Sequence, residues 1–447
     1  MGTWEGALDR VPPFFALIPF QEIRLAAVPQ PLVYVRKMGR SRAPSRPMLS
    51  KVIAAAVLIV NVCLPPAGVA VVHAQAPAIV VHRQPGVPIV SLRLSVLAND
   101  PPGYAGAGHL IQHLRYPGLQ DQASRVGGRA QIQRTSDAVV YTVTGPAAEL
   151  PFLSRLLLST LEPPEATTAE FLQADRALRE ERLGEWETAP AHARSMLRAQ
   201  LFPADLSAAG TDRSATRFTP SRLADIWASM YRPDRVSILA VGDVYLDDVK
   251  RAFSAVPDGR PVSLGIERDS VVLSALAPAQ ATNAWIGIAY PASDLEPAAV
   301  SVAARMLGDL LRTQVPSAEV NAEHWWTHHG QAIAIIATMP EDDFPAARRV
   351  LGTAVGTLLE DVDFLSVSAA ATAIRHEMLF YSRTTERMAE LIGQFVDREG
   401  NPEAAERFYI GLDSLDDGDV RDLLERLIER TPARVEIPPQ ILDEDLR

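Results

Sequence analysis

Two histidines four residues apart are the side chains of this sequence best placed to do chemistry. His109 and His113 stand in the segment A-G-A-G-H-L-I-Q-H, residues 105–113. Positions i and i+4 of an α-helix share one face, so both imidazoles could bind one metal ion, and zinc is the ion that such a pair suits. A hydrolytic zinc site also needs a group that takes a proton from water, and the side chain beside this pair is the amide of Gln112. An amide cannot accept that proton, so the pattern predicts a metal pair without its general base.

A second histidine cluster lies in E-H-W-W-T-H-H, where His324, His328 and His329 surround two tryptophans. Tryptophan favours strands, and no carboxylates are aligned with these histidines at helical spacing. We therefore interpret the cluster as a surface or interface feature. The sequence contains no G-x-S-x-G nucleophile elbow, no phosphate-binding glycine loop and no G-x-G-x-x-G motif.

The composition is that of a folded globular protein with an acidic surface. Hydrophobic residues make up 47% of the chain and charged residues 22%, and the formal net charge is −11. Residues 1–75 are locally basic, with eight Lys/Arg against three Asp/Glu, so the remainder is more acidic than the total suggests. An acidic surface repels phosphate groups, so we expect no nucleic-acid partner.

The N-terminal region has the organisation of a secretory signal. Lys51 precedes an apolar run at 52–64, and small residues follow. Residues 48–76 are therefore predicted to be a signal peptide, with a membrane anchor as the alternative, and residues 1–47 an upstream extension without structure. We expect an exported protein, periplasmic or secreted, that has no permanent membrane span after processing. The single cysteine, Cys63, excludes an intramolecular disulfide.

The same order of predicted elements occurs twice, about 194 residues apart. The matching features are the strands at 89–98 and 284–290, Pro146 and Pro340 at strand ends, the helices from 148 and at 344–359, and the strands at 236–241 and 434–437. This predicts an α+β fold of two tandem duplicated halves, 78–262 and 263–447, each an antiparallel-rich sheet covered by helices. The helix at 300–311 corresponds to the histidine helix, which we expect to end near Pro117. It contains no histidine, so a metal site belongs to the first half.

These motifs, taken in order, resemble the pitrilysin/insulinase family of inverzincin metallopeptidases, in the branch with subunits of about this size. Residues 106–113 resemble the family's G-x-A-H-x-x-E-H helix. Residues 127–141, G-G-R-A-Q-I-Q-R-T-S-D-A-V-V-Y, resemble its G-G-x-x-N-A-x-T-x-x-D-x-T-x-Y hairpin, and Y-R-P at 231–233 resembles its Y-x-P phrase. The resemblance implies the fold shared by LuxS-like and processing-peptidase-like metallohydrolases. With Gln112 at the general-base position, the chain resembles a degenerate member.

The resemblance also implies a third zinc ligand and a substrate-binding residue. The family's third ligand is a glutamate on a later helix, and an ungapped alignment places Arg182 there while a shift of one residue places Glu181. An arginine cannot ligate zinc, so the choice between the two alignments decides whether the metal site is complete, and Glu181 is the candidate ligand. In the second half the family uses an arginine and a tyrosine to hold the substrate backbone. Arg312 matches the arginine, whereas Glu319 stands at the tyrosine position.

The function that the resemblance implies is that of a catalytically impaired peptidase homologue. It would act as a non-catalytic partner of a homologous peptidase subunit, or as a homodimer, in a clamshell that holds unfolded peptide, with zinc as the candidate cofactor. Two alternatives stay open at this point. In the first, the chain is a zinc-dependent endopeptidase of unfolded peptides with an atypical site. In the second, it is a stand-alone scaffold protein.

Overall fold

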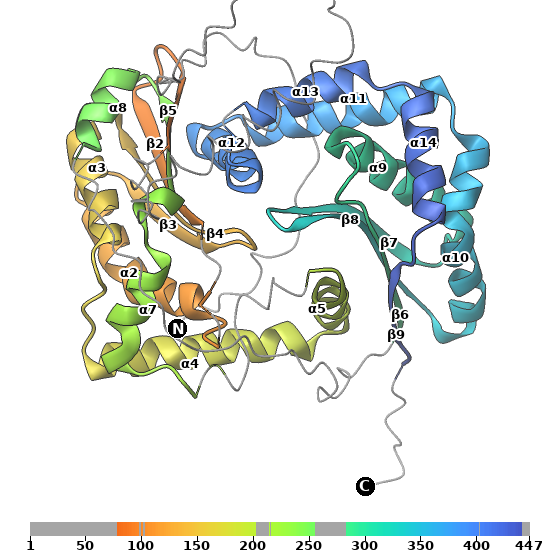
Figure 1. Ribbon diagram of the computed structural model, residues 1–447, viewed down its shortest axis with the longest axis horizontal. Helices are drawn as coiled ribbons and strands as arrows, with labels where there is room; N and C mark the ends of the chain where they lie inside the picture. The colour runs from red at the N-terminus through yellow and green to blue at the C-terminus, as the bar shows by residue number, and fades with distance from the viewer. Residues whose placement is uncertain are drawn as a thin grey trace, which may run out of the picture. The chain divides into compact units, whose positions relative to one another are not determined.

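The computed structural model describes residues 78–97, 100–101, 103–202, 214, 216–254, 283–401 and 403–439. These residues form two β-sheets and the helices that cover them (Figure 1). The predicted upstream extension, the predicted signal peptide and the segment that joins the two halves lie outside the described residues.

The first sheet combines five strands in the order β1-β5-β2-β4-β3. Its strands are β1 (Ala78–Arg83), β2 (Ile89–Leu97), β3 (Arg129–Arg134), β4 (Ala138–Pro146) and β5 (Val236–Gly242). β1 pairs with β5 in parallel, and every other pair is antiparallel. β3 therefore forms one edge of the sheet.

Apolar and polar side chains alternate along β2, so the two buried faces of the first sheet differ in character. Every second residue from Val90 to Val96 is apolar and packs into the core beneath the helices of the first half. The intervening side chains of Ser91, Arg93 and Ser95 point to the opposite face, as the two-residue period of a strand requires. All three are buried as well, so another element must cover this polar face.

The helices of the first half follow the strands in chain order. They are α2 (Ala107–Ser124), α3 (Leu150–Leu158), α4 (Thr168–Glu187), α5 (Ala189–Leu201), α7 (Leu223–Met230) and α8 (Leu246–Ala252). Apolar residues of α2, α3 and α7 form a single core with the apolar face of the first sheet.

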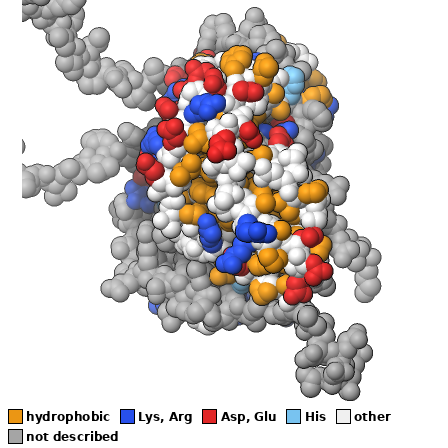
Figure 2. Space-filling view, turned by 90° about the vertical axis from the view of Figure 1, so that its right-hand side faces the viewer, with side chains coloured by type: hydrophobic (Ala, Val, Ile, Leu, Met, Phe, Trp, Pro, Cys, Tyr) orange, Lys and Arg blue, Asp and Glu red, His pale blue; other side chains and the backbone are white. Residues whose placement is uncertain are grey.

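The second half repeats this arrangement around a four-stranded antiparallel sheet. Its strands are β6 (Ala284–Pro291), β7 (Glu319–Thr327), β8 (Gly330–Met339) and β9 (Ala433–Ile437). Its helices are α9 (Pro297–Gln314), α10 (Phe344–Asp361), α11 (Phe364–Tyr381), α12 (Thr385–Glu399), α13 (Ala404–Ser414) and α14 (Asp417–Ile428). On the side of the molecule that carries α10 and α14, charged side chains of both signs are interspersed with apolar ones (Figure 2).

The duplication predicted from the sequence is confirmed by the topology. The strand order β7-β8-β6-β9 repeats the order β3-β4-β2-β5 of the first sheet. The helices that follow the equivalent strands β2 and β6 also contact the edge strands, as α2 contacts β3 and α9 contacts β7. The fold is α+β, with two antiparallel-rich sheets covered by helices.

Each half contributes one helix to the other half's sheet (Figure 1). Ala189, Ala193 and Leu197 of α5 pack on the second sheet, where Leu197 lies so close to Gly287 that a Cβ atom there would come within 2.8 Å of its Cδ1. In return α12 covers the first sheet, where Ile392 joins a small apolar cluster with strand residues. The exchange ties residues from distant parts of the sequence into common cores.

The polar face of β2 is neutralised by α12. The Arg93 guanidinium donates to both carboxylate oxygens of Asp397, at 2.6 and 3.3 Å, and both side chains are about 3% exposed. Ser91 Oγ and Thr385 Oγ1 share a buried hydrogen bond of 2.8 Å. Gly393 leaves room for the arginine, since a Cβ atom at this position would lie 2.4 Å from Arg93 Cζ. A buried charge pair with one partner removed is strongly destabilising, so this pair fixes α12 on the sheet.

Among the described residues, none of the helices combines the length and the apolar character that a membrane span requires.

Candidate metal centre

The N-terminus of α2 is held by a loop carboxylate and by two glycines. Asp100 accepts hydrogen bonds from the backbone N–H groups of Gly106, at 2.7 Å, and Gly108, at 2.9 Å. Gly106 adopts φ 89°, in the left-handed region that favours glycine. At Gly108 a Cβ atom would lie 2.9 Å from Val139 of β4. The helix therefore starts close against the sheet, two residues before His109.

The prediction that this helix ends near Pro117 is wrong, because α2 continues to Ser124 with Pro117 inside it. A proline inside a helix removes one backbone hydrogen bond. Tertiary contacts offset that loss, since Leu119 and Ala123 beyond the proline are buried in the core. The side chain of Gln120 also accepts a 2.8 Å hydrogen bond from the backbone of Ala130 on β3.

The structure brings His109, His113 and Glu181 together. Glu181 comes from α4, and its two carboxylate oxygens lie 2.8 Å from His109 Nε2 and 3.4 Å from His113 Nε2. The imidazole rings are stacked at an angle of 15° with centroids 4.8 Å apart. His109 is buried, whereas the Glu181 side chain is 51% exposed. The three side chains thus form a cluster that is open to solvent on the side of the carboxylate.

Of the two alignments that the sequence left open, the geometry matches the one that places Glu181 beside the histidines. The neighbouring Arg182 is buried elsewhere on α4. Hydrogen bonds from His109 and then His113 hold the pKa of Glu181 well below its ordinary value, against an opposing effect of partial burial. A carboxylate that stays ionised between two imidazoles is suited to bind a cation.

The donor set fits zinc. Zinc takes imidazole nitrogen and carboxylate oxygen at roughly 2.0–2.2 Å, which in a tetrahedral site separates ligand atoms by roughly 3.3 Å. The Glu181 oxygens lie 2.8 and 3.4 Å from the imidazole nitrogens, close to that spacing, and the candidate ligand atoms of all three residues lie within 4.8 Å of one another. The buried Nδ1 of His109 has no hydrogen-bond partner among the described residues, so an outer hydrogen bond of the kind common at zinc sites is not found here.

Gln112 makes a contact that a glutamate could not make. Its Nε2 donates a 3.2 Å hydrogen bond to the backbone carbonyl of Ile132, in the edge strand β3. The acceptor is a carbonyl oxygen, so the side-chain amide must point its NH₂ group there. Its other atom, Oε1, is buried and has no partner among the described residues. Gln112 therefore fastens α2 to the edge strand and leaves a hydrogen-bond acceptor free.

The motif tyrosines of the first half meet in the core. The hydroxyl groups of Tyr141, on β4, and Tyr231, after α7, are hydrogen-bonded to each other. Burial raises the pKa of Tyr141 to about 12 and the pKa of Tyr231 well above its ordinary value. Both phenols stay protonated at neutral pH, and their contact joins β4 to the end of α7.

Arg312 and Glu319 lie in the second half. Arg312 is near the C-terminal end of α9, half exposed, and its guanidinium pairs with Asp309 one turn earlier. Glu319 is the exposed first residue of β7. These two side chains lie at a helix end and on an edge strand, and the ion-pair partner of Arg312 is a neighbour on its own helix.

An ion-pair cluster occupies the position in the second half that corresponds to the metal centre. Arg305 on α9 contacts Asp309 on the same helix, with Nε 3.2 Å from Oδ2, and pairs with Glu377 on α11. Each of these residues follows its counterpart in the His109, His113 and Glu181 set by 196 residues. We missed this cluster in the sequence because only histidines were sought in the second half. The shared offset was the signal that could have revealed it.

The second histidine cluster is structural. His324 lies on β7, where burial lowers its pKa to about 3. Its ring nitrogens bond Ser301 at 2.7 Å and Gln331 at 2.8 Å. The interpretation of the cluster as a surface or interface feature is therefore wrong for His324, because strand alternation turns its ring toward Ser301 of α9. The backbone N–H of His328, at the tip of the β7–β8 hairpin, donates to Asp137 of the first half at 2.6 Å.

Comparison with solved structures identifies the fold. A protease from Helicobacter pylori superposes with a TM-score of 0.67 at 14% identity, over 82% of this chain and 98% of that one. A protein described as a peptidase M16 inactive domain, from Pseudomonas fluorescens, gives 0.68 at 14% identity, over 82% and 96%. A chain of complex III2 from Candida albicans gives 0.66 at 14% identity, over 83% and 95%.

No family profile matches the sequence. No curated protein matches it either. At this level of identity the structural likeness shows the fold alone, which is that of the M16, or pitrilysin/insulinase, peptidases.

Proposed function

We propose that this chain is a peptidase-like subunit that binds zinc and unfolded peptide without cleaving the peptide efficiently. The observation that carries the proposal is the combination of a cluster that could hold a metal ion, His109, His113 and Glu181, with an amide at the position of the general base. Losing a positioned general base typically lowers a rate on the order of 10²–10⁴-fold. Binding and cleavage would therefore be separated in this protein.

His109, His113 and Glu181 are the residues that would hold the ion. A bound zinc ion would supply Lewis acidity toward an oxygen ligand. Gln112 would contribute hydrogen bonds only, because its amide neither takes nor gives a proton at ordinary pH. The residues of this chain therefore support binding and orientation, and they supply no proton transfer at the position of Gln112.

The edge strand β3 supports peptide as the ligand. An edge strand offers backbone groups on its open side, to which an extended peptide of almost any sequence can add as a further strand. In β3 the Ala130 N–H and the Ile132 carbonyl already bond Gln120 and Gln112 of α2, so a peptide would pair with the remaining backbone groups. The Gln112 contact to Ile132 places this edge directly beside the candidate metal centre. An unfolded segment bound along β3 would thus pass the histidine pair.

A partner subunit is part of the proposal. Two of the structural neighbours are described as an inactive peptidase domain and as part of a multi-subunit complex, which supports a non-catalytic role within an assembly. The partner would be a homologous peptidase subunit or a second copy of this chain. The predicted leader would place the assembly outside the cytoplasm. N-terminal sequencing of exported protein should begin near residue 75 or 77, and a start before residue 48 would contradict the leader.

One experiment separates this proposal from its main alternative. The purified protein is analysed for zinc by mass spectrometry and incubated with a fluorescent unfolded peptide, with anisotropy reporting binding and a quenched version reporting cleavage. We expect one zinc per chain, binding, and cleavage that is barely measurable. Efficient cleavage that is lost in His113→Gln would establish the atypical endopeptidase, which the complete ligand cluster favours. Absence of both zinc and peptide binding would leave the scaffold alternative.

A further inference from the structure

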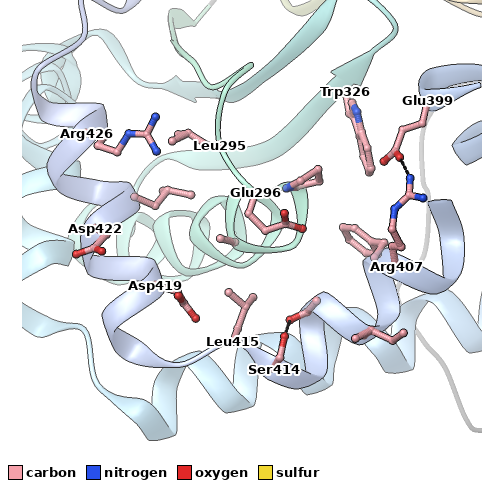
Figure 3. Close-up of a pocket in the computed structure, with 16 residues that line it drawn as sticks. Leu295, Glu296, Trp326, Glu399, Arg407, Ser414, Leu415, Asp419, Asp422 and Arg426 are labelled. Atoms are coloured by element: carbon pink, nitrogen blue, oxygen red, sulfur yellow. Dashed lines mark hydrogen bonds and ion pairs between the residues drawn. The ribbon is translucent and has the colours of Figure 1, made fainter. Parts of the chain in front are cut away.

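A pocket of about 740 Å³ lies in the second half, between the start of α9 and the helices α13 and α14 (Figure 3). All its lining residues belong to the second half, whereas the candidate metal ligands belong to the first. Its volume falls within the range of roughly 300–1,000 Å³ that is typical of ligand sites. The pocket is therefore large enough to take one or two side chains of a peptide.

One wall of the pocket is aromatic and is held in place from behind. Trp326, at the end of β7, packs its indole 5.9 Å from the ring of Phe408 on α13. The His324 ring stacks on the Trp326 indole with the ring centroids 5.5 Å apart. Both nitrogens of the His324 ring are hydrogen-bonded. Leu295 and Leu415 add apolar surface. This wall is preformed, so little ordering would be needed on binding.

The charged residues of the pocket are predominantly acidic. Four carboxylates and two arginines line it: Glu296, Glu399, Asp419, Asp422, Arg407 and Arg426. Both arginines already have carboxylate partners, because Arg407 pairs with Glu399 and Arg426 pairs with Asp294. The positive charge in the lining is therefore neutralised within the protein.

Two of the carboxylates remain without such partners. Neither the Glu296 carboxylate nor the Asp422 carboxylate forms a hydrogen bond or an ion pair with another described residue, and both residues are exposed. Glu296 precedes α9 and lies over the open space of the pocket, and Asp419 faces the same space from α14 (Figure 3). The N-terminus of α9 would by itself favour an anion, but the Glu296 carboxylate stands there and Pro297 lacks an N–H group to donate.

We propose that this pocket binds a lysine or arginine side chain together with an adjacent apolar side chain of a peptide. The unpaired carboxylates attract the cation, and Phe408 and Leu415 offer apolar surface to the adjacent side chain, whereas the Trp326 ring already has the Arg398 guanidinium 5.3 Å from its centroid. The inference deepens the proposed function, on which it rests, by adding a second peptide-binding site with a preference for basic-apolar pairs. An unfolded chain could then be held at two places at once, which raises its apparent affinity.

The test uses three capped hexapeptides of Gly and Ser that carry a central Arg-Leu, Arg-Ser or Glu-Leu pair, titrated calorimetrically into the full-length protein. The test variant combines Glu296→Gln with Asp422→Asn. The control variant combines Glu341→Gln with Asp342→Asn, which makes the same change of charge at two exposed residues beside α10. Neither pair touches the candidate metal centre.

We expect the Arg-Leu peptide to bind best. The test variant should weaken this binding about tenfold, because two partly exposed carboxylates together contribute about that factor to the affinity. The control variant should leave the affinity within about twofold. The inference would be overturned if the Arg-Leu peptide bound the test and control variants equally well. It would also be overturned if the Glu-Leu peptide bound as well as the Arg-Leu peptide, or if no peptide bound at millimolar concentration. The His113→Gln variant keeps the two hypotheses apart. This variant should keep its binding of the Arg-Leu peptide while it loses zinc. Failure of the proposed function would appear in the zinc content, and it would not depend on the substitutions at Glu296 and Asp422.

Discussion

Replacing Glu181 by glutamine should leave the metal-free protein almost unchanged and should remove most of its stabilisation by zinc. The Glu181 side chain is 51% exposed, so its contacts with the two histidines are screened by water. Exposed pairs of this kind typically contribute less than about 1 kcal/mol to the free energy of unfolding. Without zinc, the melting temperature of Glu181→Gln should therefore lie close to that of the wild type.

With zinc the expected difference is larger. An ion that binds only the folded state stabilises it by about 2.7 kcal/mol when its free concentration is 100 times the dissociation constant. For domains of 150–250 residues, 1 kcal/mol moves the melting temperature by about 2–4 °C, so zinc should raise it by roughly 5 °C or more in the wild type. Loss of one of three ligands in Glu181→Gln should abolish most of this increase.

The matched control is Glu180→Gln, which makes the same change of charge one residue away on the exposed side of α4. Differential scanning calorimetry with buffered zinc measures all three proteins. The reasoning fails if Glu180→Gln loses the zinc effect as fully as Glu181→Gln, because the ion would then respond to the charge of the helix and not to a ligand. It fails equally if zinc has no effect on the wild type.

Three further predictions test other parts of the structure. Gln112→Glu should lower the free energy of unfolding by about 1–3 kcal/mol in metal-free protein, because the Ile132 carbonyl loses its donor, and denaturant titration would show this. Gly393→Ala should cost at least about 1–3 kcal/mol in the same titration, since its Cβ atom would overlap the Arg93 guanidinium. The buried His324, with a pKa of about 3, stays neutral in the folded state. Unfolded protein takes up a proton there below about pH 6.5, so stability should fall from that pH toward pH 3, and less steeply in a variant with asparagine at this position.

The fold could be predicted from the sequence because it depends on patterns that occur twice. Strands such as β2 and β6 are strongly apolar and are bounded by turn residues, and Pro146 and Pro340 end corresponding strands in both halves. Local signals failed where tertiary contacts decide. Pro117 predicts a helix end, but burial of Leu119 beyond it stabilises the longer helix.

The exchange of α5 and α12 between the halves could not be predicted from the sequence at all. The apolar face of α5 shows that it is buried, but nothing in its sequence says against which sheet. The polar residues of β2 gave a partial signal, since Arg93 in a strand that reads as central requires a buried partner. Asp397 is 304 residues away, so only the folded chain identifies it.

At the metal centre, the sequence predicted residue types better than residue roles. The i, i+4 spacing placed His109 and His113 on one face of a helix. The choice between Arg182 and Glu181 depends on the rotation of α4 about its axis, and an alignment without close relatives does not fix that rotation. The role of Gln112 was read only as the loss of a base. Its amide contact to β3 depends on the distance between α2 and the edge strand, which no local pattern encodes.

The difference between the two halves explains why, among the described residues, the candidate metal cluster lies in the first half. In the first half two imidazoles, which are neutral when they act as ligands, flank a single carboxylate, so the cluster has negative charge that a cation would balance. In the second half the corresponding cluster contains its own cation, because the Arg305 guanidinium lies between Asp309 and Glu377. A guanidinium stays charged at any ordinary pH and cannot ligate a metal. The duplicated fold therefore uses one position in two ways, as an open ligand set in the first half and as a closed ion pair between α9 and α11 in the second.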